Sequence, residues 1–174
     1  MSVRFNREHR VKREIEQLGR LVFPPFGTHL PKPTRRDASL SREGLARDQR
    51  PKRILFIEDD RFIADMYRLG LETGGWSVDI AHDGESGLRR ALDDPPALIL
   101  LDLLLPRMDG IEVLSRLRSD PSTRDVPVLV VSNAPGLGGR EEEARKLGIV
   151  DWMVKSNTTP AKLLSRVGKI LGTD

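Results

Sequence analysis

The sequence predicts an α/β fold, a doubly wound sheet of five parallel strands with helices on both faces, preceded by an irregular N-terminal extension. Short apolar runs alternate strictly with segments whose apolar residues recur at helical spacing. This alternation implies βαβ units, and right-handed crossovers place the helices on both faces of the sheet. Glycine and proline separate the segments, as expected of connecting turns. We assign the α/β domain to residues 52–174 and the extension to residues 1–51.

The five predicted strands are short and mostly apolar. The first, Ile54–Ile57, is a continuous apolar run of the kind that is buried on both faces of a parallel sheet. The other strands lie, in chain order, at residues 76–81, 97–102, 126–132 and 152–154. Pro127 stands near the start of its strand, where a missing N–H is tolerated.

Five helices are predicted, one after each strand. Apolar residues recur at helical spacing from Phe62 to Leu71, and Gly74-Gly75 ends that segment. The other helices lie, in chain order, at residues 84–92, 111–117, 141–147 and 159–171. Thr159 can cap the last of them, and Pro160 suits its first turn because proline has no N–H to satisfy there.

The first 51 residues have a different character. Residues 11–21 could form one amphipathic helix, but four prolines between residues 24 and 33 then interrupt regular structure. Residues 32–50 are polar, which is typical of a linker or a disordered segment. Residues 1–50 hold 12 lysine and arginine residues against 6 acidic ones, a net charge of +6, whereas the remaining 17 and 20 give −3. A basic segment on an acidic domain suggests binding partners.

Composition excludes several classes of protein. The chain has no cysteine, so disulfides, thiolate metal sites and cysteine nucleophiles are ruled out. The longest apolar run, residues 97–105, contains Asp102 and falls short of the roughly 18–20 residues that a membrane helix needs. The N-terminus has no apolar stretch like that of a secretory signal. We therefore expect a cytoplasmic protein with no membrane insertion.

Polar residues that could carry chemistry follow four of the five predicted strands. In chain order they are Glu58, Asp59 and Asp60, then Asp102, Ser132 and Lys155. Ligands of such folds bind beyond the carboxyl ends of the strands, where these side chains should gather. Clustered carboxylates repel one another, and a divalent cation with hard oxygen ligands, such as Mg²⁺, relieves the repulsion. A lysine and a hydroxyl suit a phosphoryl group, and an aspartate can itself be the nucleophile that forms an acyl phosphate.

With these residues in view, residues 52–172 resemble the receiver domain of bacterial response regulators, which has a flavodoxin-like fold. Four segments carry the resemblance, and their sequences are ILFIEDD at 54–60, LDLLLPRMDG at 101–110, PVLVVS at 127–132 and WMVK at 152–155. The Asp-x-x-x-Pro-x-x-Asp-Gly pattern in the second segment is the most specific of them.

The resemblance implies a role for each site residue. Asp102 would be the phosphoacceptor. Asp59 would bind Mg²⁺ directly and Glu58 through water, and Asp102 and the backbone carbonyl of Leu104 would complete the protein ligands. Asp60, the third acid, should begin the loop and cap the first helix.

Further roles follow from the same resemblance. Lys155 would pair with a phosphoryl oxygen, and Ser132 would donate to another once Asp102 is modified. Trp152 occupies the aromatic switch position, although a tryptophan there also suits the core. Leu104 and Ala134 occupy two positions that tune signal lifetime. Neither side chain can orient a water molecule, so we expect slow self-dephosphorylation.

Two residues depart from the family pattern. Ser156 follows the lysine, where the family usually has a proline in a cis peptide, so the loop must be held in another way. Asn133 follows Ser132, where a small residue is usual, which would narrow access to the site.

The resulting prediction is a receiver of a two-component or phosphorelay system. A histidine kinase or histidine phosphotransfer protein would phosphorylate it, and it would signal by contacts with an unknown downstream protein. It would catalyse only its own phosphorylation and dephosphorylation. The chain ends just after the last predicted helix, so no separate C-terminal output domain is expected.

Two alternative functions are also considered, one based on the basic N-terminal segment and one on the site residues. In one, the receiver regulates nucleic-acid or membrane-surface binding by the basic tail, where five cationic residues cluster between Arg4 and Arg13. Such a run is more often simply solvated. In the other, the chain is a hydrolase of the aspartate-nucleophile phosphatase type. Those enzymes have a second acid two residues after the nucleophile, and Leu104 at that place argues against this alternative.

Overall fold

A computed structural model describes residues 51–133 and 139–173, and in these residues the predicted α/β fold is confirmed. One sheet holds five parallel strands in the order β2-β1-β3-β4-β5. The strands are β1 (Arg53–Ile57), β2 (Ser77–Ala81), β3 (Leu98–Leu101), β4 (Val128–Ser132) and β5 (Asp151–Val154). The helices are α2 (Arg61–Glu72), α3 (Gly84–Asp93), α4 (Gly110–Ser119), α5 (Arg140–Lys146) and α6 (Pro160–Leu171), and a short 3₁₀ helix, η1 (Lys155–Asn157), follows β5.

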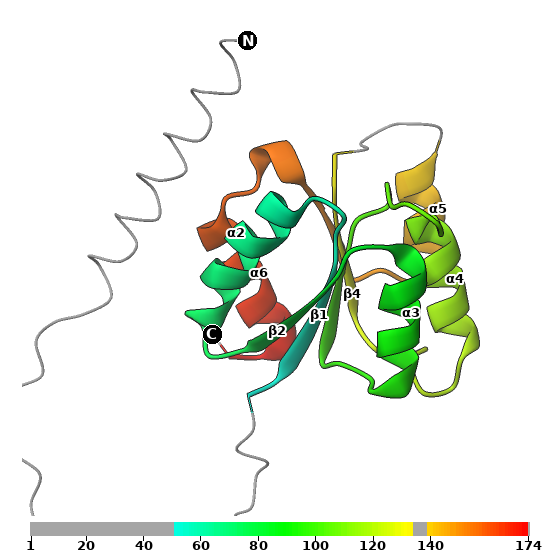
Figure 1. Ribbon diagram of the computed structural model, residues 1–174, viewed down its shortest axis with the longest axis horizontal. Helices are drawn as coiled ribbons and strands as arrows, with labels where there is room; N and C mark the ends of the chain where they lie inside the picture. Colours follow the sequence, from blue (N-terminus) through cyan, green and yellow to red (C-terminus); the bar gives the residue numbers. More distant parts are fainter. Residues whose placement is uncertain (1–50, 134–138, 174) are drawn as a thin grey trace, which may run out of the picture. The chain divides into compact units, whose positions relative to one another are not determined.

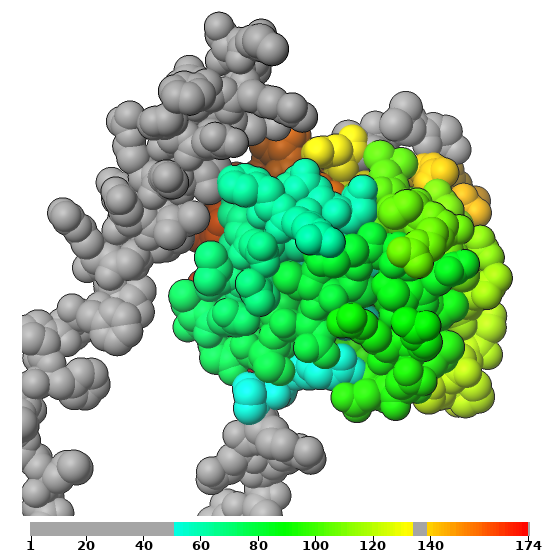
Figure 2. Space-filling model, in the orientation of Figure 1, coloured from blue at the N-terminus to red at the C-terminus, as the bar shows by residue number. Residues whose placement is uncertain are grey.

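The helices form a layer on each face of the sheet (Figure 1). Helices α2 and α6 lie on one face, and α3, α4 and α5 lie on the other. Each predicted strand and helix within the described residues is present, with bounds that differ by one or two residues. The predicted helix at residues 11–21 and the irregular extension lie outside the described residues. In the space-filling view, α2 and α3 form much of the visible face of the domain (Figure 2).

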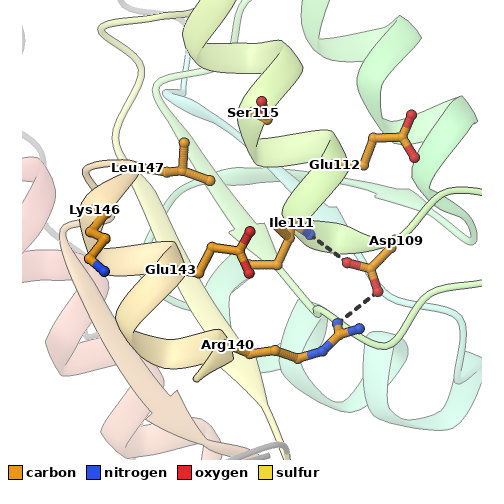
Figure 3. Close-up of a pocket in the computed structure, with 8 residues that line it drawn as sticks. All are labelled: Asp109, Ile111, Glu112, Ser115, Arg140, Glu143, Lys146 and Leu147. Atoms are coloured by element: carbon orange, nitrogen blue, oxygen red, sulfur yellow. Dashed lines mark hydrogen bonds and ion pairs between the residues drawn. The ribbon is translucent and has the colours of Figure 1, made fainter. Parts of the chain in front are cut away.

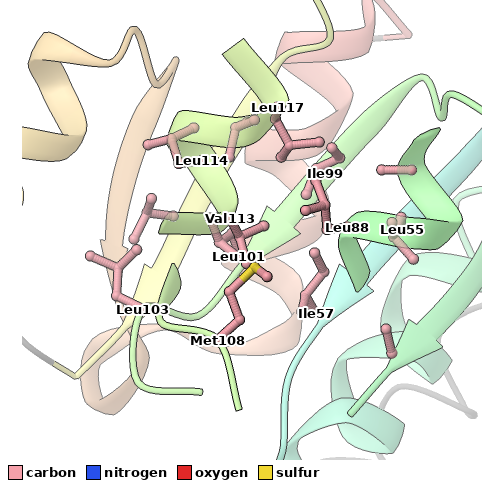
Figure 4. Close-up of a cluster of buried hydrophobic side chains, with 14 of the residues drawn as sticks. Leu55, Ile57, Leu88, Ile99, Leu101, Leu103, Met108, Val113, Leu114 and Leu117 are labelled. Atoms are coloured by element: carbon pink, nitrogen blue, oxygen red, sulfur yellow. The ribbon is translucent and has the colours of Figure 1, made fainter. Parts of the chain in front are cut away.

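Each helix layer packs on its own apolar core. Beneath α3, α4 and α5, side chains such as Val113 and Leu117 lie beside Ile99 and Leu101 of β3 (Figure 4). A second core lies beneath α2 and α6. Every residue of β3 and β4 is buried, as the continuous apolar runs predict. Burying one leucine or isoleucine side chain contributes about 1.5–3 kcal/mol, so these cores stabilise the sheet whose strand ends carry the predicted site residues.

Short caps and close contacts fix the loops at the carboxyl end of the sheet. Asp60 caps α2, as predicted, and accepts hydrogen bonds from the N–H groups of Phe62 at 2.9 Å and Ile63 at 3.2 Å. Asp109 caps α4 in the same way. A side chain at Gly110 would collide with the backbone oxygen of Asp102, so glycine lets the start of α4 approach the end of β3 closely.

None of the helices in the described part of the chain is long and apolar enough to cross a membrane.

Candidate functional site

The carboxyl ends of four adjacent strands bring the predicted site residues together. Glu58 and Asp59 follow β1, Asp102 follows β3, Ser132 ends β4 and Lys155 follows β5. Because β1, β3, β4 and β5 are neighbours in the sheet, their ends meet along one edge.

Three carboxylates form the acidic part of the site. One oxygen from each of Glu58, Asp59 and Asp102 lies within 4.8 Å of the other two. Glu58 is fully buried and Asp102 is 4% exposed, whereas Asp59 is exposed to solvent. Hard oxygen donors with one solvent-facing member suit a cation that keeps some of its water, as Mg²⁺ does. The donor set therefore fits the predicted metal.

Lys155 joins the two buried carboxylates. Its side chain is 8% exposed, and Nζ lies 2.5 Å from both Asp102 Oδ2 and Glu58 Oε2. A buried ion pair of this kind is stable only when each charge has a partner. The lysine thus compensates two negative charges that would otherwise face each other at close range.

The protonation behaviour of the site follows from burial and from this pairing. Burial raises the pKa of Glu58 to about 7, although the hydrogen bond and the charge of Lys155 act in the opposite direction. Burial alone would lower the pKa of Lys155, but hydrogen bonds to Asp102 and Glu58, together with their charges, raise it overall. The lysine is therefore held in its cationic form.

Asp102 is oriented by three donors from three different segments. Lys155 contacts Oδ2, while Oδ1 accepts hydrogen bonds from Ser132 Oγ at 2.6 Å and from the Leu104 N–H at 3.1 Å. The carboxylate can therefore turn little about its side-chain bonds. A carboxylate oxygen held in this way has the geometry that attack on an electrophile entering from solvent requires.

Two of the predicted switch and lifetime residues, Trp152 and Leu104, lie within the described residues. Trp152 lies opposite Val130 in the sheet and packs, half-buried, against the core beneath α3, α4 and α5. The side chain of Leu104 is 48% exposed. Ala134 lies outside the described residues. The structure thus brings Glu58, Asp59, Asp102, Ser132 and Lys155 together, and their roles stay predictions.

Some contacts around the site were not predicted from the sequence. The Tyr67 hydroxyl donates to the Thr158 carbonyl at 2.8 Å and so ties α2 to the loop after β5. The Ser156 N–H donates to Asn133 Oδ1 at 2.9 Å. Neither bond has a local sequence signal, because each joins residues distant along the chain.

A shallow pocket lies beside the site, between α4 and α5 (Figure 3). Arg140, the first residue of α5, forms a 2.7 Å ion pair with Asp109, and the other Asp109 oxygen accepts from the Ile111 N–H at 2.9 Å. Asp109 therefore links the starts of both helices. None of the three clustered carboxylates lines this pocket.

Comparisons with known proteins agree with this geometry. The profile of the response regulator receiver domain matches residues 54–168. The chain is 46% identical over 121 residues to the DNA-binding dual master transcriptional regulator RpaA of Synechocystis, and the match covers 68% of this chain and 48% of RpaA. It is 41% identical over 80 residues to the response regulator MprA of Mycobacterium avium, which covers 46% of this chain and 34% of MprA. The chain thus spans at most about half the length of these relatives.

A solved structure shares the fold. The receiver domain of the sensor histidine kinase PA1611 from Pseudomonas aeruginosa, with a magnesium ion coordinated in its active site cleft, is 25% identical and has a TM-score of 0.64. That match covers 70% of this chain and 98% of the PA1611 receiver domain. The profile match spans well over half of the sequence and coincides with the sheet and the acidic site. The chain therefore belongs to the response regulator receiver domain family.

Proposed function

We propose that this receiver domain accepts a phosphoryl group on Asp102 from a histidine kinase or a histidine phosphotransfer protein. The observation that carries the proposal is the set of three donors on the Asp102 carboxylate, from Lys155, Ser132 and the Leu104 N–H. These donors orient the nucleophile before the reaction, and the two other carboxylates beside it supply oxygen ligands for a cation.

The transfer step is a displacement at phosphorus. An oxygen of Asp102 forms the new P–O bond, while the bond from phosphorus to the imidazole nitrogen of the donor histidine breaks and its electron pair returns to that ring. Lys155, which contacts Asp102 before the transfer, then pairs with a negatively charged oxygen of the transferred phosphoryl group. Ser132, whose Oγ already donates to Asp102, can donate to a second phosphoryl oxygen.

Glu58, Asp59, Asp102 and the Leu104 carbonyl would hold Mg²⁺. When bound, the cation neutralises charge that builds up on the phosphoryl oxygens. The fit rests on the three carboxylates that converge within 4.8 Å. Lys155 now lies between Glu58 and Asp102, and with their charges compensated by a cation it could pair with the phosphoryl group instead.

Phosphorylation would then shift the population of a second conformation. Movement of Ser132 toward the phosphoryl group would leave space that Trp152 can fill, because both residues sit on the adjacent strands β4 and β5. A changed surface over α5, β5 and α6 would bind the downstream protein. The half-buried position of Trp152 supports this role, because a partly exposed side chain has fewer packed neighbours to displace when it moves.

Leu104 would make the phosphorylated state persistent. Its half-exposed apolar side chain stands beside the acceptor and cannot orient water for in-line attack. Ala134 would act in the same sense, so loss of the phosphoryl group should be slow unless a phosphatase assists.

The basic tail supports a second, weaker candidate. The net charge of +6 in residues 1–50 favours contact with polyanions, and the relative RpaA is described as DNA-binding. The receiver could then control nucleic-acid binding by this segment.

The absence of a separate output domain stays a prediction, because the matched relatives are longer than this chain.

A phosphotransfer assay tests the proposal. The protein is incubated with acetyl phosphate, or with an autophosphorylated histidine kinase, in the presence of Mg²⁺ or of EDTA, and its intact mass is measured. We expect one added phosphoryl group, labile in alkali, with Mg²⁺ and none with EDTA. Equal incorporation in both conditions, or none in either, would contradict the proposal.

A further inference from the structure

A side chain from one loop holds the backbone of the next loop at the edge of the site. Asn133 follows Ser132 at the end of β4, and Ser156 follows Lys155 just beyond β5. The Ser156 N–H donates to Asn133 Oδ1 at 2.9 Å. A proline at position 156 has no N–H and could not make this bond. The two residues that depart from the family pattern are therefore partners of each other.

This hydrogen bond, the Asn133–Ser156 clasp, lies one residue beyond the groups that hold the acceptor. Ser132 contacts Oδ1 of Asp102 and Lys155 contacts Oδ2. The strands are paired in register, with Ser132 opposite Val154. Beyond this last backbone pair, the clasp connects the ends of β4 and β5 once more, through the Asn133 side chain instead of the backbone.

The far side of the same turn is fixed separately. The Thr158 hydroxyl donates to the Val154 carbonyl at 2.8 Å, and the Tyr67 hydroxyl donates to the Thr158 carbonyl at 2.8 Å. Within the described residues, Asn133 is the side chain that ties the near side of the turn, at Ser156, to β4. Lysine has a long, flexible side chain, so the position of its ammonium group depends on how firmly the backbone beneath it is held.

We infer that Asn133 is a positioning residue for Lys155, an inference that rests on the proposed phosphoryl transfer to Asp102. It acts through the Ser156 N–H and does not touch Asp102. With the clasp in place, the lysine stays aligned with Oδ2 while Ser132 holds Oδ1. Without it, the turn at Lys155–Asn157 loses its link to β4, and the ammonium group samples positions away from the acceptor.

The inference is tested by comparing Asn133→Ala in two backgrounds, the natural chain and Ser156→Pro. With Ser156 present, Asn133→Ala should slow phosphorylation by acetyl phosphate on the order of threefold, the effect of one neutral hydrogen bond. In the Ser156→Pro background the same change should not slow phosphorylation, because the N–H that Asn133 accepts from is absent. Equal slowing in both backgrounds would overturn the inference.

Magnesium affinity separates positioning from general damage. Asn133→Ala should leave the Mg²⁺ affinity, read from tryptophan fluorescence, unchanged while the rate of phosphorylation falls. A parallel loss of both would show a structural defect and would overturn the positioning role.

Amide exchange at Ser156 tests the clasp without any phosphorylation. This amide should be protected in the natural chain and in Asn133→Asp, which keeps Oδ1, and should exchange faster in Asn133→Ala. Unchanged exchange in Asn133→Ala would overturn the inference even if Ser156→Pro fails to fold. Failure of the natural chain to accept phosphate would instead contradict the proposed function, whatever the exchange result.

Discussion

Glu58→Gln should change how the stability of the protein depends on pH. Glu58 is fully buried, and its pKa rises from 4.5 to about 7 in the folded state. Between these two values the folded protein binds more protons at this site than the unfolded chain does. The stability that Glu58 contributes is therefore complete below pH 4.5 and is lost as the pH rises through about 7.

The magnitude follows from the width of that interval. From 4.5 to about 7, at about 1.4 kcal/mol per pH unit, ionisation of Glu58 removes roughly 3–4 kcal/mol of unfolding free energy. Glutamine keeps the shape and the acceptor oxygen but does not titrate. The variant and the natural protein should therefore have similar stability near pH 4.5, and the variant should be more stable by roughly 3–4 kcal/mol at pH 8.

Urea unfolding in EDTA, followed by tryptophan fluorescence between pH 4.5 and 8, measures this difference. Saturating Mg²⁺ serves as the control, because a cation near Glu58 favours its ionised form and should flatten the pH dependence of the natural protein. If the unfolding free energies of the two proteins instead change with pH in parallel, Glu58 does not titrate as its burial implies.

Three further perturbations have definite expected outcomes. Lys155→Ala removes the cation between Glu58 and Asp102, so in EDTA it should lower the unfolding free energy, measured in urea, by about 3 kcal/mol. The variant should still bind Mg²⁺ in a fluorescence titration, and loss of Mg²⁺ binding would count against this arrangement. Leu104→Asn places a water-orienting amide beside the acceptor and should speed loss of the phosphoryl group by about tenfold, or about 1.4 kcal/mol of barrier; equal decay in both proteins would show that this side chain does not govern water access. A chain that starts at Lys52 contains all the described strands and the acidic site, so it should fold, as circular dichroism would show, and accept phosphate, as intact mass would show. A shortened chain that fails to fold would indicate that the domain needs residues 1–51.

Most of the fold could be predicted because its sequence signals are local. The apolar run Ile54–Ile57 and the buried strands β3 and β4 carry no alternation, which is how strands covered on both faces look. Topology then predicts which polar residues meet, since parallel strands end at one edge. For this reason the convergence of Glu58, Asp59 and Asp102 could be predicted from residue order alone.

The contacts between loops could not be predicted in the same way. The link of Lys155 to both Glu58 and Asp102 depends on distances of a few ångströms that no residue pattern encodes. The Asn133–Ser156 bond was visible in the sequence only as two separate departures from a pattern. The resemblance to the receiver family implied that the loop after Lys155 needs another support, and the Asn133 side chain supplies a contact there that the sequence did not reveal.

Asp102→Asn tests directly whether Asp102 is the phosphoacceptor, and Asp60→Asn serves as the matched control. Both changes replace a carboxylate with an amide of the same shape, at a buried position for Asp102 and at an exposed one for Asp60. Asparagine can still cap α2 at position 60. After incubation with acetyl phosphate and Mg²⁺, we expect intact mass to show one phosphoryl group on the natural protein and on Asp60→Asn, and none on Asp102→Asn with an unchanged circular dichroism spectrum. A folded Asp102→Asn protein that still gains an alkali-labile phosphoryl group would show that Asp102 is not the phosphoacceptor.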